Sequence, residues 1–122
     1  MKLNPDCIRD ILFAIEEKST YFEGITLPDE TPPGLAAYTT DEILYHVRQC
    51  DHSGLLLGYR PYLGGACSVK DLSPSGHSFL ADVRTDSNWE KVKASAGKVG
   101  SVSLPILIKI AADFVMKAIL GE

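Results

Sequence analysis

The sequence has few of the features that mark secreted, disulfide-bonded or metal-stabilised proteins. Its three cysteines, Cys7, Cys50 and Cys67, are widely separated and form no C-x-x-C pair. This spacing argues against a disulfide framework or a zinc knuckle. Charged residues interrupt the segment 1–15, which therefore lacks the apolar core of a secretory signal. We expect reduced thiols and a cytoplasmic protein.

Signatures of nucleotide binding and of nucleophilic catalysis are also missing. The sequence has no G-x-x-x-x-G-K, G-x-G-x-x-G or G-x-S-x-G pattern, which are the common marks of phosphate loops and hydrolase nucleophiles. Ser75, His77 and Asp82 fall on one expected helix, but their spacing points the side chains in different directions. We expect no enzyme, cofactor or metal.

The composition is that of an ordinary globular domain with a slight excess of acid. The chain has 122 residues, of which 45% are hydrophobic and 23% charged, so we expect a single domain over residues 1–122. The formal net charge of −4 argues against strong non-specific binding of nucleic acid. A local basic patch could still bind DNA.

The segment 39–58 predicts a helix, a tight stop and a strand, and we expect the rest of the chain to be arranged around it. Thr39 or Thr40 can cap the helix and Gly54 can end it. Apolar residues recur on one face of the helix. The opposite face carries Asp41, Tyr45, Arg48, Gln49 and His52.

The elements on both sides of this helix suggest a winged helix-turn-helix. Before it, the pattern predicts a helix from Asn4 to about Lys18, a short strand within 21–27, a proline-rich loop over 28–34 and one turn over 35–38. After it, strands over 55–59 and 66–72 flank a hairpin tip with paired glycines. The turn takes the place of an abbreviated second helix, and the hairpin that of a wing.

Three more helices complete the predicted fold. Ser73 and Pro74 begin one, a second runs from about residue 86 to a stop at Gly97, and a third covers 103–120. The predicted fold class is therefore α+β and mostly helical. It has a winged-helix-like core over about 4–85, a two- or three-stranded wing sheet, and a C-terminal helical extension over about 86–120.

The last helix has an unusually wide apolar surface. Its charges, Lys109, Asp113 and Lys117, line one narrow stripe, whereas a surface helix needs an apolar arc of only about 100°. The three charges disfavour a membrane span. We expect burial within the domain or in a homo-oligomer. The candidate interface residues are Leu104, Leu107, Ile108, Phe114, Val115 and Ile119.

Part of the sequence resembles a known family. The run Asp71-Leu72-Ser73-x-x-Gly76-His77-x-Phe79-Leu80 is followed by Arg84, Trp89-x-Lys91-Val92-Lys93 and Gly97-Lys98-x-Gly100-Ser101-x-Ser103. Together with His46 and the Gly54-Leu55 helix exit, this pattern resembles a bacterial and prophage family of unknown function with a winged-helix-like fold, over residues 4–119. The resemblance implies a small winged-helix-like protein encoded in bacterial chromosomes and phages. It brings no activity, cofactor or catalytic residue.

Two functions follow from these expectations. The candidate contacts to DNA or to a protein partner are Tyr45, Arg48, Gln49, His52, Arg60 and Lys70. However, the helix over 40–53 has one arginine against three acidic residues, and recognition helices need cationic side chains for phosphates and base edges. We therefore rank a module that binds another protein or a second copy of itself first. A DNA-binding transcriptional regulator is the alternative.

Overall fold

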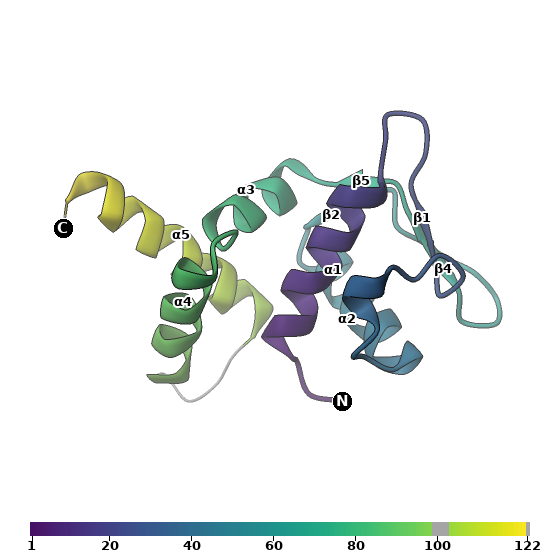
Figure 1. Ribbon diagram of the computed structural model, residues 1–122, viewed down its shortest axis with the longest axis horizontal. Coiled ribbons are helices and arrows are strands. Elements are labelled where there is room, and N and C mark those ends of the chain that lie inside the picture. The colour runs from purple at the N-terminus through teal and green to yellow at the C-terminus, as the bar shows by residue number, and fades with distance from the viewer. Residues whose placement is uncertain (99–102, 122) are drawn as a thin grey trace.

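Helix α1 lies at the centre of the fold. The structure, a computed structural model, describes residues 1–98 and 103–121. In chain order the elements are α1 (Pro5–Lys18), β1 (Ile25–Leu27), the 3-10 turn η1 (Pro33–Leu35), α2 (Thr40–His52), β2 (Leu56–Leu57), β3 (Arg60–Pro61), β4 (Cys67–Val69), β5 (Asp71–Leu72), α3 (Pro74–Asp82), α4 (Asp86–Lys98) and α5 (Leu104–Leu120). Helix α1 packs against α2, η1 and α3, and Figure 1 shows it between the sheet and α3 to α5. The expectation that the helix over 40–53 organises the chain is thus corrected.

The start and the inner face of α1 follow from local sequence. The side chain of Asn4 accepts hydrogen bonds from the backbone amides of Asp6 and Cys7, at 3.1 and 3.4 Å, and Pro5 occupies the first helical position. These are the expected signals of a helix start. The buried side chains are Cys7, Ile8, Ile11, Leu12, Ala14 and Ile15. Burying each of the larger ones contributes about 1.5–3 kcal/mol before the entropy of ordering is subtracted.

The strands form one three-stranded sheet and one two-stranded sheet. The larger sheet is antiparallel with the order β1-β4-β3, and Ser68 at its centre faces Thr26 on one side and Arg60 on the other. Strands β2 and β5 form the smaller sheet. We predicted uninterrupted strands over 55–59 and 66–72. The first is instead shortened to β2, because Gly58 takes a left-handed conformation with φ of 68° that breaks the extended chain. The returning segment is divided into β4 and β5 at Lys70.

The C-terminal helices pack on the core through buried residues of each helix. The hydroxyl of Ser73 accepts from the amide of Gly76 at 3.0 Å and donates to the carbonyl of Gly54 at 2.6 Å, so the cap of α3 also ties it to the end of α2. Helix α4 continues through Gly97 to Lys98, which corrects the predicted stop at Gly97.

The fold is mostly helical α+β, as predicted. Buried apolar side chains from α1 to α5 form one continuous cluster, which ends at Ala111 in the middle of α5. The second half of α5 extends past α3 and α4 to the C-terminal end (Figure 1). No helix within the described residues is long and apolar enough to cross a bilayer.

Candidate functional site

The outward face of α2 and the β3–β4 hairpin enclose a shallow cleft of about 350 Å³. Tyr45 and Arg48 from α2 line one side, and Tyr59, Pro61 and Tyr62 line the other. The guanidinium carbon of Arg48 lies 5.9 Å from the centre of the Tyr45 ring, within the range of a cation–π contact. The cleft therefore presents one cationic side chain, that of Arg48, beside aromatic rings.

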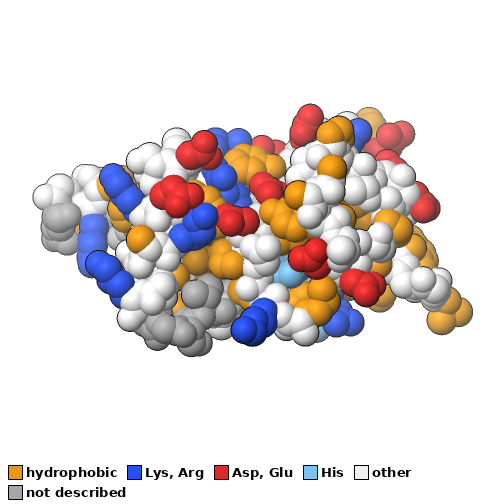
Figure 2. Space-filling model, turned by 60° about the horizontal axis from the view of Figure 1, so that its bottom comes forward, with side chains coloured by type: hydrophobic (Ala, Val, Ile, Leu, Met, Phe, Trp, Pro, Cys, Tyr) orange, Lys and Arg blue, Asp and Glu red, His pale blue; other side chains and the backbone are white. Residues whose placement is uncertain are grey.

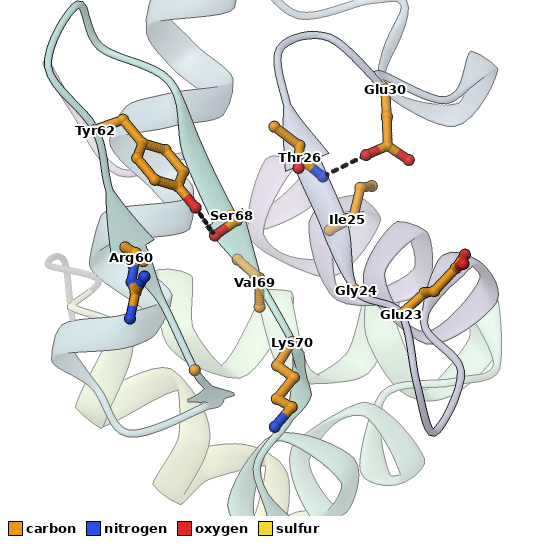
Figure 3. Close-up of a pocket in the computed structure, with 11 residues that line it drawn as sticks. Glu23, Gly24, Ile25, Thr26, Glu30, Arg60, Tyr62, Ser68, Val69 and Lys70 are labelled. Carbon is orange, nitrogen blue, oxygen red and sulfur yellow. Dashed lines mark hydrogen bonds between the residues drawn. The ribbon is translucent and has the colours of Figure 1, made fainter.

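A larger cleft of about 580 Å³ covers the outer face of the three-stranded sheet (Figure 3). Arg60 and Lys70 supply cations, whereas Glu23 and Glu30 supply acids from the β1 side. The hydroxyl groups of Tyr62 and Ser68 lie 3.0 Å apart in a hydrogen bond. The two cationic and two acidic side chains give this cleft no net charge. It therefore lacks the concentrated positive charge of a phosphate-binding surface.

The outward backbone groups at the free edge of β1 already have hydrogen-bond partners within the chain. The amide of Thr26 donates to the Glu30 carboxylate at 3.0 Å, and the amide of Glu30 donates to the carbonyl of Thr26 at 2.8 Å. Glu30 thus satisfies both outward groups of the middle residue of β1 (Figure 3). At the opposite edge, Pro61 in β3 has no amide hydrogen to offer. The sheet is a poor template for an added strand.

Four of the six predicted contact residues lie around the hairpin. Tyr45 and Arg48 line the smaller cleft, Arg60 and Lys70 line the larger one, and Tyr62 borders both. Tyr62 was not predicted as a contact. The remaining two, Gln49 and His52, line neither cleft; Gln49 is half-buried and His52 is exposed at the end of α2.

Positive and negative side chains are interleaved over the surface that Figure 2 shows. Within the smaller cleft, Asp41 lies with Arg48, so neither cleft is purely basic. Burial raises the pKa of the nearby Tyr59 phenol, even though Arg48 acts in the opposite direction. That phenol therefore stays neutral and can donate a hydrogen bond at neutral pH.

The predicted interface residues on α5 differ in exposure, because some are buried in the core of the chain and others face outward. Leu104 and Leu107 are only 3% and 0% exposed. They serve the core of this chain, which corrects their assignment to an interface with a second one. Ile108, Phe114 and Val115 are half-buried, whereas Ile119 is 72% exposed. The large apolar side chains of α5 that are exposed are Ile106, Met116, Ile119 and Leu120, which we call the α5 surface.

A buried histidine links α2 to α1, and sequence reasoning missed it. His46 is 1% exposed. Its Nε2 accepts from the amide of Asn4 at 2.8 Å, and its Nδ1 lies 2.7 Å from the carbonyl oxygen of Glu42. The four-residue spacing of Glu42 and His46 was a local signal. The contact with Asn4 spans most of the first half of the chain, and no local signal in the sequence predicted it.

A polar network fastens α4 to α1. The Asp6 carboxylate accepts from the indole nitrogen of Trp89 at 2.7 Å and from the Lys93 ammonium at 2.9 Å. Burial opposes ionisation of Asp6, but these two hydrogen bonds together with the positive charges of Lys93 and Arg9 outweigh it and lower its pKa. Nearby, the guanidinium of Arg9 donates to the carbonyl oxygens of Val83 and Arg84, at 2.9 and 2.7 Å. The arrangement is a structural clamp on α1, α3 and α4.

The cysteines are buried thiols. All three are free, and burial raises the pKa of Cys7 to about 12, with Glu42 and Asp10 adding to the effect. Their thiols are therefore poor nucleophiles at neutral pH. Within residues 1–98 and 103–121, no three histidine, cysteine or acidic side chains are grouped so that they could hold a metal ion.

Comparison with known proteins identifies a family. No curated protein and no solved structure matches the chain. One family model matches residues 2–103, a span that contains the lining of both clefts apart from Met1 and the motifs quoted above, although Gly100 and Ser101 lie outside the described residues. The match ends just before α5, so the family likeness is narrower than the expected 4–119. The chain belongs to the family described as "Hypothetical protein (DUF2513)", a domain family of unknown function.

Proposed function

We propose that this protein is a non-catalytic interaction module that associates with a protein partner through the α5 surface. The observation that carries the proposal is the exposure of four large apolar side chains on one helix. Met116, Ile119 and Leu120 are 53%, 72% and 62% exposed, and Ile106 is 45% exposed. Large apolar side chains exposed together on one helix are a feature of interaction sites in soluble proteins.

The position of α5 supports the same proposal. Its first half is held by the buried residues Leu104, Leu107 and Ala111, whereas its second half has no buried residue. An isolated helix of this length is marginal in water, and most helical stability comes from packing an apolar face. A partner laid along the second half would supply the packing that α3 and α4 give to the first.

Charge substitution on the α5 surface tests the proposal. The double variant Ile119→Lys/Leu120→Lys replaces exposed side chains, so it should keep its fold and circular dichroism while losing association. Leu63→Lys is the control, because Leu63 is fully exposed in the turn between β3 and β4. Figure 1 shows this sheet on the other side of α1 from α5. The molar mass in solution, measured by light scattering, should fall only for the α5 variant. Equal masses for wild type, control and double variant would contradict the proposal.

A second candidate, a DNA-binding regulator, is supported by the order of the elements. A helix, a strand, a short turn, a helix and a hairpin follow one another, and the strand order β1-β4-β3 places the first strand beside the returning one. This order is consistent with the winged-helix arrangement that we predicted from the sequence, and it supports this second candidate. Arg48 and Arg60 would be the phosphate contacts from α2 and the hairpin.

Fluorescence anisotropy of a labelled duplex tests this second candidate. Binding should weaken steeply as salt rises, and Arg48→Ala/Arg60→Ala should weaken it without unfolding because both side chains are exposed. If the wild-type protein leaves the anisotropy unchanged at low salt, the regulator proposal is wrong.

A further inference from the structure

We infer that the partner of α5 is a second copy of this chain, with the two α5 helices paired antiparallel about a two-fold axis that crosses the helix at the level of residue 115. The inference rests on the proposed function and specifies its partner; of the α5 surface, it places Leu120 in the paired stripe. It starts from four residues that we call the α5 seam: Ile110, Asp113, Lys117 and Leu120. Their steps of three, four and three residues keep them on one stripe of the helix, as in the seam of a two-stranded coiled coil.

The α5 seam is accessible along the second half of the helix. Asp113, Lys117 and Leu120 are exposed and Ile110 is half-buried. The helix faces its own core with Leu104, Leu107 and Ala111, and at 100° per residue the middle of that face lies more than a quarter turn from the middle of the α5 seam. Since this half of α5 extends past α3 and α4 (Figure 1), a second helix can lie alongside it.

The seam complements itself only in the antiparallel orientation. When the axis lies at the level of residue 115, a residue a given number of positions before 115 faces the residue of the second copy the same number of positions after 115. Asp113 then meets Lys117 of the second copy, and Ile110 meets Leu120 of the second copy. The symmetry repeats each contact, giving two ion pairs and two apolar pairs. This is the self-matching that an isologous interface requires.

Parallel pairing would oppose like charges. Each Asp113 would face its own counterpart, and each Lys117 likewise, which is unfavourable at close range. Within residues 1–98 and 103–121, Asp113 and Lys117 take part in no ion pair of the chain itself. Both charges are thus available to a second copy and set the orientation of the pair.

Charge reversal tests the pairing. Asp113→Lys opposes lysines across the axis and Lys117→Asp opposes aspartates, so each variant alone should dimerise about tenfold or more weakly than wild type. A mixture of the two variants restores both ion pairs in a heterodimer and should recover wild-type affinity. Single variants that dimerise as tightly as wild type would overturn the inference, as would a mixture no tighter than either component.

Disulfide trapping fixes the orientation independently. Under mild oxidation, Ile110→Cys mixed with Leu120→Cys should give mainly the mixed disulfide, whereas each variant alone should cross-link poorly. The native cysteines are buried and do not compete. Efficient cross-linking of each variant with itself would overturn the antiparallel arrangement while leaving the proposed function standing. A wild-type protein that stays monomeric would instead overturn both.

Discussion

The imidazole of His46 accepts a hydrogen bond from the backbone amide of Asn4, with 2.8 Å between Nε2 and the amide nitrogen. The ring therefore carries its proton on Nδ1, where it donates to the carbonyl of Glu42. Because Asn4 is the cap of α1, a side chain of α2 fixes the place where α1 begins. The contact joins the two helices that pack side by side in this part of the fold.

Replacing this histidine should destabilise the protein. His46→Leu removes the acceptor and leaves the amide of Asn4 without a partner, which costs about 1–3 kcal/mol of the free energy of unfolding. His52→Leu is the control, because His52 is exposed on the same helix and should change stability by no more than about 0.5 kcal/mol. Urea titration monitored by circular dichroism compares the two. Equal midpoints would refute the structural role of His46.

The hydrogen bonds to Asp6 predict a loss of stability in acid. The folded protein holds the pKa of Asp6 below its ordinary value, so the unfolded state takes up the proton first as pH falls. The contribution of ionised Asp6 is present above about pH 4 and lost as pH falls through the folded-state pKa.

The variant Asp6→Asn measures this contribution of ionised Asp6 to the free energy of unfolding. Because the Asp6 side chain is 53% exposed, solvent screening limits its contribution to about 0.5–1 kcal/mol. The variant should be less stable than wild type at pH 7 by this amount, and the difference should shrink near pH 3. Denaturant titrations at the two pH values measure it, and a difference that stays the same at both would argue against the assigned ion pair.

Two helical glycines should respond in opposite ways to alanine. A Cβ at Gly76 would overlap the carbonyl of Leu55, whereas a Cβ at Gly97 would meet no atom of residues 1–98 or 103–121 within 4 Å. Gly76→Ala should therefore separate α3 from the end of α2 and cost about 1–3 kcal/mol. Gly97→Ala should be neutral or stabilising by up to about 1 kcal/mol. Thermal melts rank the variants, and a Gly76 variant as stable as wild type would contradict the close packing.

The thiols should resist modification until the protein unfolds. Burial raises the pKa values of Cys7, Cys50 and Cys67, and attack requires an exposed thiolate. A chromogenic disulfide reagent should react slowly with the native protein and promptly with all three thiols in denaturant. Rapid reaction of even one thiol under native conditions would show that the burial is incomplete.

Local signals in the sequence predicted the helix starts well. Asn4, Thr39 and Ser73 each cap a helix through a side-chain hydrogen bond, and Thr39 forms a full capping box with Glu42. Such caps depend on residues two or three positions apart. The class of fold followed from the order of the helices and strands. The division of the hairpin at Gly58 did not follow from the sequence, because a glycine within a strand pattern can adopt either an extended or a left-handed conformation.

The candidate site was harder to predict because exposure depends on distant neighbours. Leu107 and Ile119 look alike in an apolar helix, yet the first is 0% and the second 72% exposed. The difference arises from where α3 and α4 cover α5, which helical periodicity does not encode. The partnership of His46 with Asn4 was hidden for the same reason. In contrast, Arg48 and Arg60 were correctly placed on exposed surfaces.

Sedimentation velocity of the unmodified protein over a wide concentration range tests association through α5 most directly. The chain has a mass of 13.3 kDa. We predict that the weight-average mass rises with concentration and levels off at twice the chain mass, as expected for a closed two-fold pair. A mass that stays at that of one chain at every concentration would contradict self-association, and growth beyond two chains would contradict its two-fold closure.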